Sequence, residues 1–191
     1  MRRAGKIIII LGILLVLCGF GIMLLLEVTT DRAELDSADI LSRLKELLPP
    51  ETIGAPEEYS DTDMPVLELN GRDIIGLLTL QPTGTELPVA AEWNKKTLIS
   101  FPQRFSGSTY DSSLVIGGYD RKGQFDCLKT LDVGNEISVT DMTGAKFTYT
   151  VSDIKRKKSV EEDVLTNADS DLTLFVCDSE TNEYIVVYCT K

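Results

Sequence analysis

The sequence predicts a mostly β protein, in which an eight-stranded barrel with one short helix follows a transmembrane helix and an amphipathic helix. Three observations support this class: a charge-free run near the N-terminus, a helical spacing of apolar residues after it, and short β-like runs between Gly and Pro in the remainder. The predicted parts are a cytoplasmic N-terminus (1–6), a membrane span (7–26), an amphipathic helix (31–48), an acidic linker (49–63) and a barrel domain (64–191).

The predicted membrane span, residues 7–26, contains no charged residue and has the length that a helix needs to cross the hydrocarbon core. Arg2, Arg3 and Lys6 precede it and Glu27 follows it, so the positive-inside rule predicts a cytoplasmic N-terminus. A cleaved signal peptide is the alternative, but its apolar region would be shorter, roughly 7 to 15 residues, and would end at a small-residue cleavage site. We therefore expect a single-pass protein of the cell membrane whose C-terminal domain lies outside.

The part that follows the predicted span is strongly acidic. It holds all 30 Asp and Glu residues and 16 of the 19 Lys and Arg residues, which is a net charge of −14. This charge argues against nucleic acid and anionic lipid surfaces as partners. The same part has three cysteines, Cys127, Cys177 and Cys189, and an odd number argues against a scaffold built on disulfides.

An amphipathic helix is predicted over residues 31–48, because apolar residues recur there every three or four positions. These residues are Leu35, Ala38, Leu41, Leu44 and Leu48. Pro49 and Pro50 end the pattern, and residues 51–63 have little apolar content. This stretch is predicted to be a linker or a loosely attached loop.

Eight short β-like runs are predicted after the linker. They cover residues 66–70, 74–80, 98–100, 114–117, 136–140, 146–154, 172–177 and 184–189. Short strands separated by Gly or Pro turns are typical of a closed or nearly closed antiparallel barrel. Residues 124–131 interrupt them with one or two helical turns, because Phe125, Leu128 and Leu131 would share a face.

The residue types restrict the chemistry. The chain has no histidine, which removes Ser-His-Asp and Cys-His catalysis as well as His-ligated metals. It also has no glycine-rich phosphate loop and no CxxC pair, so no cofactor and no metal is predicted. Cys177 remains, at the end of the apolar run DLTLFVC. From position alone, a structural role as a small buried hydrophobe competes with a functional one.

Five segments, taken in order, resemble the sortases, membrane-anchored cysteine transpeptidases of Gram-positive bacteria, and are most similar to the class B-like group. The segments are NGRDIIGLLTL (70–80), ELPVAAEWN (86–94), PQRFSGS (102–108), LVIGGYDRKGQFDCLKTLDVGNEISV (114–139) and DLTLFVCDSETNEYIVVYC (171–189). The resemblance spans nearly all of residues 64–191, and the fold that it implies is the eight-stranded sortase β-barrel.

The resemblance implies that Cys177 is the nucleophile, whose thiolate in the family attacks a threonine carbonyl of a sorting signal and forms a thioacyl enzyme that an amine resolves. Tyr119 stands at the position of the family histidine, which supplies acid/base chemistry. By spacing, Tyr184, or its neighbour Glu183, stands at the position of the arginine that stabilises the oxyanion. Loss of an acid/base group costs roughly 10²- to 10⁴-fold in rate, and loss of an oxyanion donor roughly 10²- to 10³-fold.

Three hypotheses follow. The leading one is a catalytically impaired sortase homologue that binds sorting-signal peptides, surface proteins or an active sortase. The second is an active, atypical sortase or cysteine hydrolase, in which Asp120 or Tyr119 takes protons and Arg104 stabilises the oxyanion. The third is a purely structural barrel subunit whose groove is filled by its own side chains. Arg104, Arg121 and Lys122 are the only basic residues in the matching segments that could approach the site, and a solvated surface role is the default expectation for all three. The oligomeric state is left open.

Overall fold

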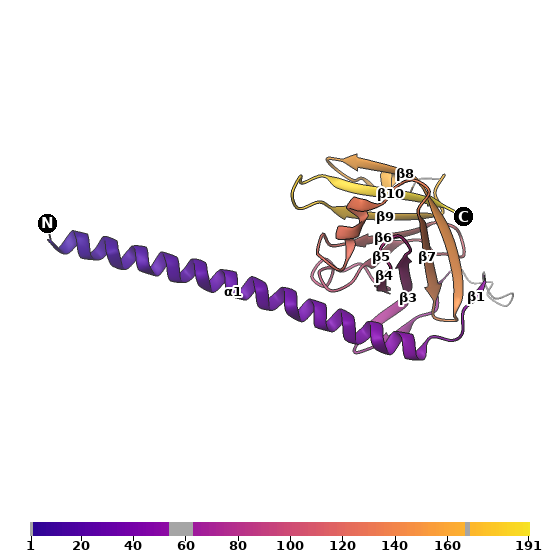
Figure 1. Cartoon of the computed structure of the whole chain (residues 1–191), viewed down its shortest axis with the longest axis horizontal. Coiled ribbons are helices and arrows are strands. Elements are labelled where there is room, and N and C mark those ends of the chain that lie inside the picture. The colour runs from indigo at the N-terminus through magenta and orange to yellow at the C-terminus, as the bar shows by residue number, and fades with distance from the viewer. Residues whose placement is uncertain (1, 54–62, 167–168) are drawn as a thin grey trace. The chain divides into compact units, whose positions relative to one another are not determined.

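A computed structural model describes residues 2–53, 63–166 and 169–191, with the side chains of 2–10, 22–34 and 162–163 left out. The chain divides into two compact units, Met1–Leu35 and Asp36–Lys191. Helix α1 (Arg2–Leu47) forms the first unit and continues into the second. Figure 1 shows α1 and the strands of the second unit.

The predicted span, residues 7–26, lies within α1. Its residues 7–10 and 22–26 fall outside those whose side chains are described. Within the described part of the chain, no helix combines the length and the hydropathy needed to cross a membrane.

The last turns of α1 pack against the β domain. Ile40 and Leu44 are fully buried there and join an apolar cluster with Leu69, Ile74 and Phe101. The predicted apolar stripe is therefore present only in part. Leu41 and Leu48 pack against this cluster, but Ala38 is exposed and Leu35 is 72% exposed, and the buried Ile40 was not predicted.

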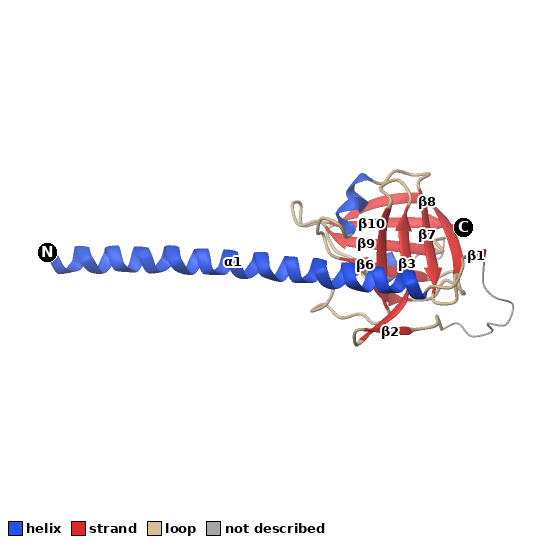
Figure 2. Cartoon of the chain, turned by 60° about the horizontal axis from the view of Figure 1, so that its bottom comes forward, coloured by secondary structure: helices blue, strands red, loops and turns tan. Residues whose placement is uncertain are grey.

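The second unit contains the predicted barrel. Its strands are β1 (Thr52–Ile53), β2 (Leu67–Leu69), β3 (Arg72–Leu80), β4 (Thr85–Ala90), β5 (Gln103–Ser106), β6 (Leu114–Gly118), β7 (Glu136–Asp141), β8 (Ala145–Lys157), β9 (Leu172–Cys177) and β10 (Tyr184–Thr190). Strands β3 to β10 close a ring in the order β3-β4-β5-β6-β9-β10-β8-β7, because β7 pairs with both β8 and β3. Figure 2 shows this curved sheet, with β2 at its margin. The eight-stranded barrel is confirmed.

The ring has the predicted number of eight strands, but two of them differ from those predicted. Residues 98–100 form a turn, and the run at 66–70 becomes β2, which pairs only with β3. Strands β4 and β5 take their places. The prediction missed β4 because Pro88 lies in its middle, and proline argues against a strand when only the sequence is read. The expectation of a purely antiparallel barrel is wrong, because β4 pairs with β5, and β6 with β9, in parallel.

Two short helices complete the second unit. The predicted helical turns at 124–131 are present as the 3₁₀ helix η1 (Phe125–Thr130), which buries Phe125 and Leu128. A second helix, α2 (Glu162–Leu165), was not predicted, because four residues are too few for a helical periodicity to show. Leu165 of α2 is buried in a cluster that lies apart from the barrel interior, together with Phe175 and Tyr188.

Candidate functional site

Three neighbouring strands bring the predicted site residues to the same end of the barrel. Strands β6 and β9 run in parallel with Gly118 opposite Val176, so Tyr119 and Cys177 both lie where these strands end. Strand β10 runs antiparallel to β9 and begins at that end, where Tyr184 is the direct partner of Cys177. Because cross-strand partners share a face of the sheet, Tyr184 and Cys177 lie side by side.

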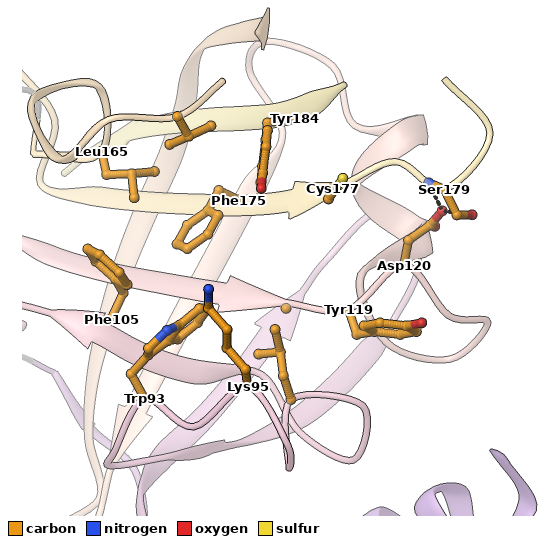
Figure 3. Close-up of a pocket in the computed structure, with 13 residues that line it drawn as sticks. Trp93, Lys95, Phe105, Tyr119, Asp120, Leu165, Phe175, Cys177, Ser179 and Tyr184 are labelled. Carbon is orange, nitrogen blue, oxygen red and sulfur yellow. Dashed lines mark hydrogen bonds between the residues drawn. The ribbon is translucent and has the colours of Figure 1, made fainter. Parts of the chain in front are cut away.

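A cavity of about 550 Å³ lies beside these three residues. The residues that line it are Trp93, Lys95, Leu98, Phe105, Gly118, Tyr119, Asp120, Val160, Leu165, Phe175, Cys177, Ser179 and Tyr184. Figure 3 shows Tyr184 extending into the cavity alongside Cys177, whereas the Tyr119 ring does not point toward the thiol. The cavity volume falls in the range of small-molecule and peptide pockets, and its walls are mainly apolar.

Three aromatic rings form one wall of the cavity. Trp93 and Phe105 are 5.3 Å apart between ring centroids and meet edge to face, and each lies 5.7 Å from Phe175. Gly117 of β6 permits this packing. A Cβ atom at this position would come within 2.5 Å of the Trp93 ring and 2.6 Å of the Phe175 ring, so any side chain would push the wall outward.

A buried ion-pair network fixes the loops on either side of Cys177. Lys129 of η1 binds Asp120 at 2.8 Å and Asp178 at 3.2 Å, and the two carboxylate side chains are only 6% and 5% exposed. Asp120 also accepts hydrogen bonds from the backbone N–H of Ser179, at 2.8 Å, and from its hydroxyl, at 2.6 Å. The loop after β6 is therefore joined to the residues that directly follow Cys177, and Arg156 of β8 adds a further bond to Asp178 at 3.1 Å.

The network holds both carboxylates in the charged form. Burial opposes ionisation of Asp120, but hydrogen bonds from Lys129 and Ser179 outweigh it and keep its pKa below the usual value. The pKa of Asp178 lies well below its usual value, first because the Glu180 N–H donates to the carboxylate and then because Arg156 and Lys129 also donate. Asp120, predicted as an alternative base, is therefore placed beside Cys177 but held as an ion-paired anion.

The predicted cations are not brought to this cavity. Arg104 lines a separate cavity, and its Nε donates to the Ala91 carbonyl at 3.1 Å. Arg121 is buried and its Nε donates to the Ile99 carbonyl at 3.1 Å, while Lys122 is exposed on the same loop. None of these three residues is among those that line the cavity beside Cys177.

Lys95 is the lysine that the structure places at the cavity, and sequence reasoning missed it. It lies in the loop between β4 and β5, two residues after Trp93, and Figure 3 shows its side chain extending along the Trp93 side toward Phe175. The sequence offered no signal that separates Lys95 from its neighbour Lys96. Trp93 was identifiable, because it belongs to the ELPVAAEWN segment, but its role as a wall depends on the fold.

The other two cysteines of the barrel lie in its interior. Cys127 and Cys189 are both free and buried, and burial raises the pKa of each thiol to about 12. Cys177 is also free but is partly exposed at the cavity. Among the described residues, no group of His, Cys, Asp or Glu side chains is arranged to hold a metal ion. The site can therefore present one thiol to a ligand held between aromatic walls.

Comparison with known proteins supports the resemblance found in the sequence. The sortase domain family model matches residues 78–191, which is more than half of the chain. A search of curated proteins gave no match.

Similar solved structures include Streptococcus agalactiae sortase C1 in complex with MTSET (19% identity, TM-score 0.53, covering 61% of this chain and 68% of that one) and Corynebacterium diphtheriae sortase A (18%, 0.54, 63% and 62%). Another is Clostridium perfringens sortase C with the C-terminal cell wall sorting motif (19%, 0.53, 62% and 71%). At these identities the likeness shows the fold alone. The class B-like assignment made from the sequence stays a prediction.

Alkylation should separate the three barrel cysteines. We expect iodoacetamide to label Cys177 in the native protein and to leave Cys127 and Cys189 unlabelled at neutral pH, because their thiols are buried and protonated. Mass spectrometry of the digested protein reads each site, and labelling in urea, where all three should react, is the control. Labelling of Cys127 or Cys189 as fast as Cys177 would contradict the structure.

Removal of the Lys129 ammonium should destabilise the barrel in a pH-dependent way. We expect Lys129→Met to lower the free energy of unfolding by roughly 1–2 kcal/mol at pH 7, because two buried carboxylates lose a charge-assisted hydrogen bond. Both carboxyls have lowered pKa values in the folded state, so their contribution to stability is fully present above about pH 4, near the unfolded value, and is lost as the pH falls from there through the lowered folded values.

The difference in unfolding free energy between wild type and Lys129→Met should therefore narrow from pH 7 to pH 2 in urea unfolding experiments, with the change confined to the range below about pH 4. The matched control is Lys122→Met, an exposed lysine of the neighbouring loop, which should change stability by less than about 0.5 kcal/mol. An equal loss of unfolding free energy in Lys129→Met at both pH values would show that Lys129 acts through packing rather than through charge.

Proposed function

Because the chain belongs to the sortase family, we propose that it is a membrane-anchored member with impaired transpeptidase activity, whose groove binds a sorting-signal peptide noncovalently. One observation carries this proposal. Cys177 is present at an open cavity, whereas the residues that the sequence resemblance sets at the positions of the family histidine and arginine are Tyr119 and Tyr184, or its neighbour Glu183.

The impairment follows from the chemistry of these two tyrosines. A phenol carries no positive charge, so Tyr184 can donate one hydrogen bond to an oxyanion but adds neither the attraction of a guanidinium cation nor its bidentate geometry. Tyr119 is 47% exposed and its ring does not point toward the thiol. The two tyrosines thus supply neither the base nor the cation that acyl transfer requires.

Peptide binding is supported by the shape and composition of the cavity. Its aromatic wall can cover apolar side chains of a ligand, and the end of β9 at Cys177 lies beside it. A sortase C with the same fold has been solved with a C-terminal cell wall sorting motif. The open cavity also argues against the purely structural barrel, which requires the groove to be filled.

The binding proposal is tested with a sorting-signal peptide added to the full chain in detergent. We expect the peptide to slow alkylation of Cys177 in a saturable way while intact-mass measurement detects no thioacyl adduct. Cys177→Ala should retain peptide binding, measured by fluorescence anisotropy. An adduct on wild type that is absent from Cys177→Ala would instead establish the active, atypical sortase.

That second candidate is favoured by one observation, the presence of Lys95 at the same cavity as Cys177. A lysine there would supply the cation that Arg104 does not bring to the cavity. The adduct experiment discriminates the two functions directly, and Lys95→Met would abolish any adduct if the cation assists its formation.

Membrane anchoring rests on the charge-free run at 7–26 and its basic N-terminal flank. Where side chains of this run are described, large apolar ones such as Leu15 and Val16 are 70% and 72% exposed. We expect the full chain to stay in the membrane pellet after an alkaline carbonate wash and to leave it only in detergent. Protease added outside intact protoplasts should digest the barrel, and release by carbonate would contradict the anchor.

A further inference from the structure

We propose that the groove selects a ligand that carries a carboxylate beside an aromatic or large apolar group, and that Lys95 binds the carboxylate. The inference rests on the proposed function of the groove as a ligand site and specifies the chemistry of its ligand. A C-terminal carboxylate or an acidic side chain of a peptide would meet this requirement equally, because both present the same group.

The balance of charge at the cavity favours an anion. Two of the residues that line it are charged, Lys95 and Asp120. Asp120 is already neutralised by Lys129 and by two hydrogen bonds from Ser179. Lys95 makes no ion pair and no hydrogen bond through its side chain among the described residues, and Glu92, three residues before it, is exposed and faces a different cavity. The uncompensated charge at the cavity is therefore positive, although the chain as a whole carries −11.

The walls strengthen the attraction between the Lys95 ammonium and an anion, and they determine the chemistry of the rest of the ligand. Trp93, Phe105 and Phe175 form a continuous apolar surface next to Lys95. An ion pair against such a surface is less screened than one on an open face, because low-polarity walls replace part of the water around it. A ligand with only a carboxylate would leave the aromatic wall uncovered, and one with only a ring would leave the ammonium unpaired.

Lys96 provides a matched control for Lys95. It is the next residue, it carries the same charge, and it is exposed, but it does not line the cavity. Its backbone N–H donates to the Asn94 side chain at 3.0 Å, which a change of its side chain leaves in place. An effect of overall charge or of loop stability would appear in Lys95→Met and in Lys96→Met alike. Loss of carboxylate binding would appear only in Lys95→Met.

The test compares 3-phenylpropionate with 3-phenylpropionamide, which are nearly the same size and differ in one end group, a charged carboxylate or a neutral amide. Binding to the full chain in detergent is followed by NMR chemical shifts. We expect the carboxylate to bind about tenfold more tightly than the amide, as one charge-assisted hydrogen bond provides. Lys95→Met should remove this preference, and Lys96→Met should keep it. Equal binding of the two probes, or equal loss in both variants, would overturn the proposal.

The thiol in the same cavity offers a second readout. Two thiol reagents of opposite charge are compared, the anionic sulfonatoethyl methanethiosulfonate and the cationic trimethylammonioethyl methanethiosulfonate. The ratio of the rates at which they modify Cys177, anionic over cationic, reports the electrostatic potential at the thiol. We expect Lys95→Met to lower this ratio by about threefold or more, for charges up to about 10 Å apart, and Lys96→Met to leave it nearly unchanged. An unchanged ratio in Lys95→Met would show that its charge does not act at the site.

These outcomes separate the inference from the proposed function. If the sorting-signal peptide protects Cys177 but the carboxylate is not preferred, the groove binds peptides and the assignment of Lys95 is wrong. If neither the peptide nor either phenyl probe binds, both the proposed function and the inference fail.

Discussion

The site depends on one element of register, the parallel pairing of β6 with β9 that sets Gly118 opposite Val176. This pairing brings together two strands that are more than fifty residues apart in the chain, and their ends deliver Tyr119 and Cys177 to one place. A shift of one residue would turn Cys177 to the barrel interior, because side chains of a strand alternate between its faces. The position of Tyr184 follows from the same register, since β10 pairs with β9 directly.

Electrostatics then divides the charged residues near the thiol into two groups. One group forms ion pairs within itself: Lys129 pairs with Asp120 and Asp178, and Arg156 pairs with Asp178. These bonds hold the loops around Cys177 in place. The net stability that such pairs add is modest, because desolvation of the charges offsets much of their attraction. The loop that carries Lys95 is outside this network, so its charge is available to whatever enters the cavity.

The sequence predicted the class of the fold and four of the residues that line the cavity, Tyr119, Asp120, Cys177 and Tyr184, but not the geometry. Alternation and apolar runs located β3 and β6 to β10, because these strands are buried on at least one face. It did not locate β4 and β5, whose assignment depends on long-range pairing around Pro88 and on a four-residue segment. The local pattern of residue types also does not predict which Lys or Arg side chain lines a cavity. Arg104 was chosen from its segment, whereas Lys95 reaches the site only because the β4–β5 loop folds along it.

Two adjacent glycines in β6 make the groove and the hydrophobic core close neighbours. A Cβ at Gly117 would meet Trp93 and Phe175 in the groove wall, and one at Gly118 would meet the ring of Phe125, which belongs to the barrel interior. Aromatic rings of the groove wall and of the barrel interior thus pack against the same two glycines, which have no side chains. The wall has no side-chain layer there to absorb a displacement, so a change in the volume of the core at Phe125 is transmitted to the shape of the groove. Variation in the interior can in this way tune what the groove accepts without altering any residue that a ligand touches.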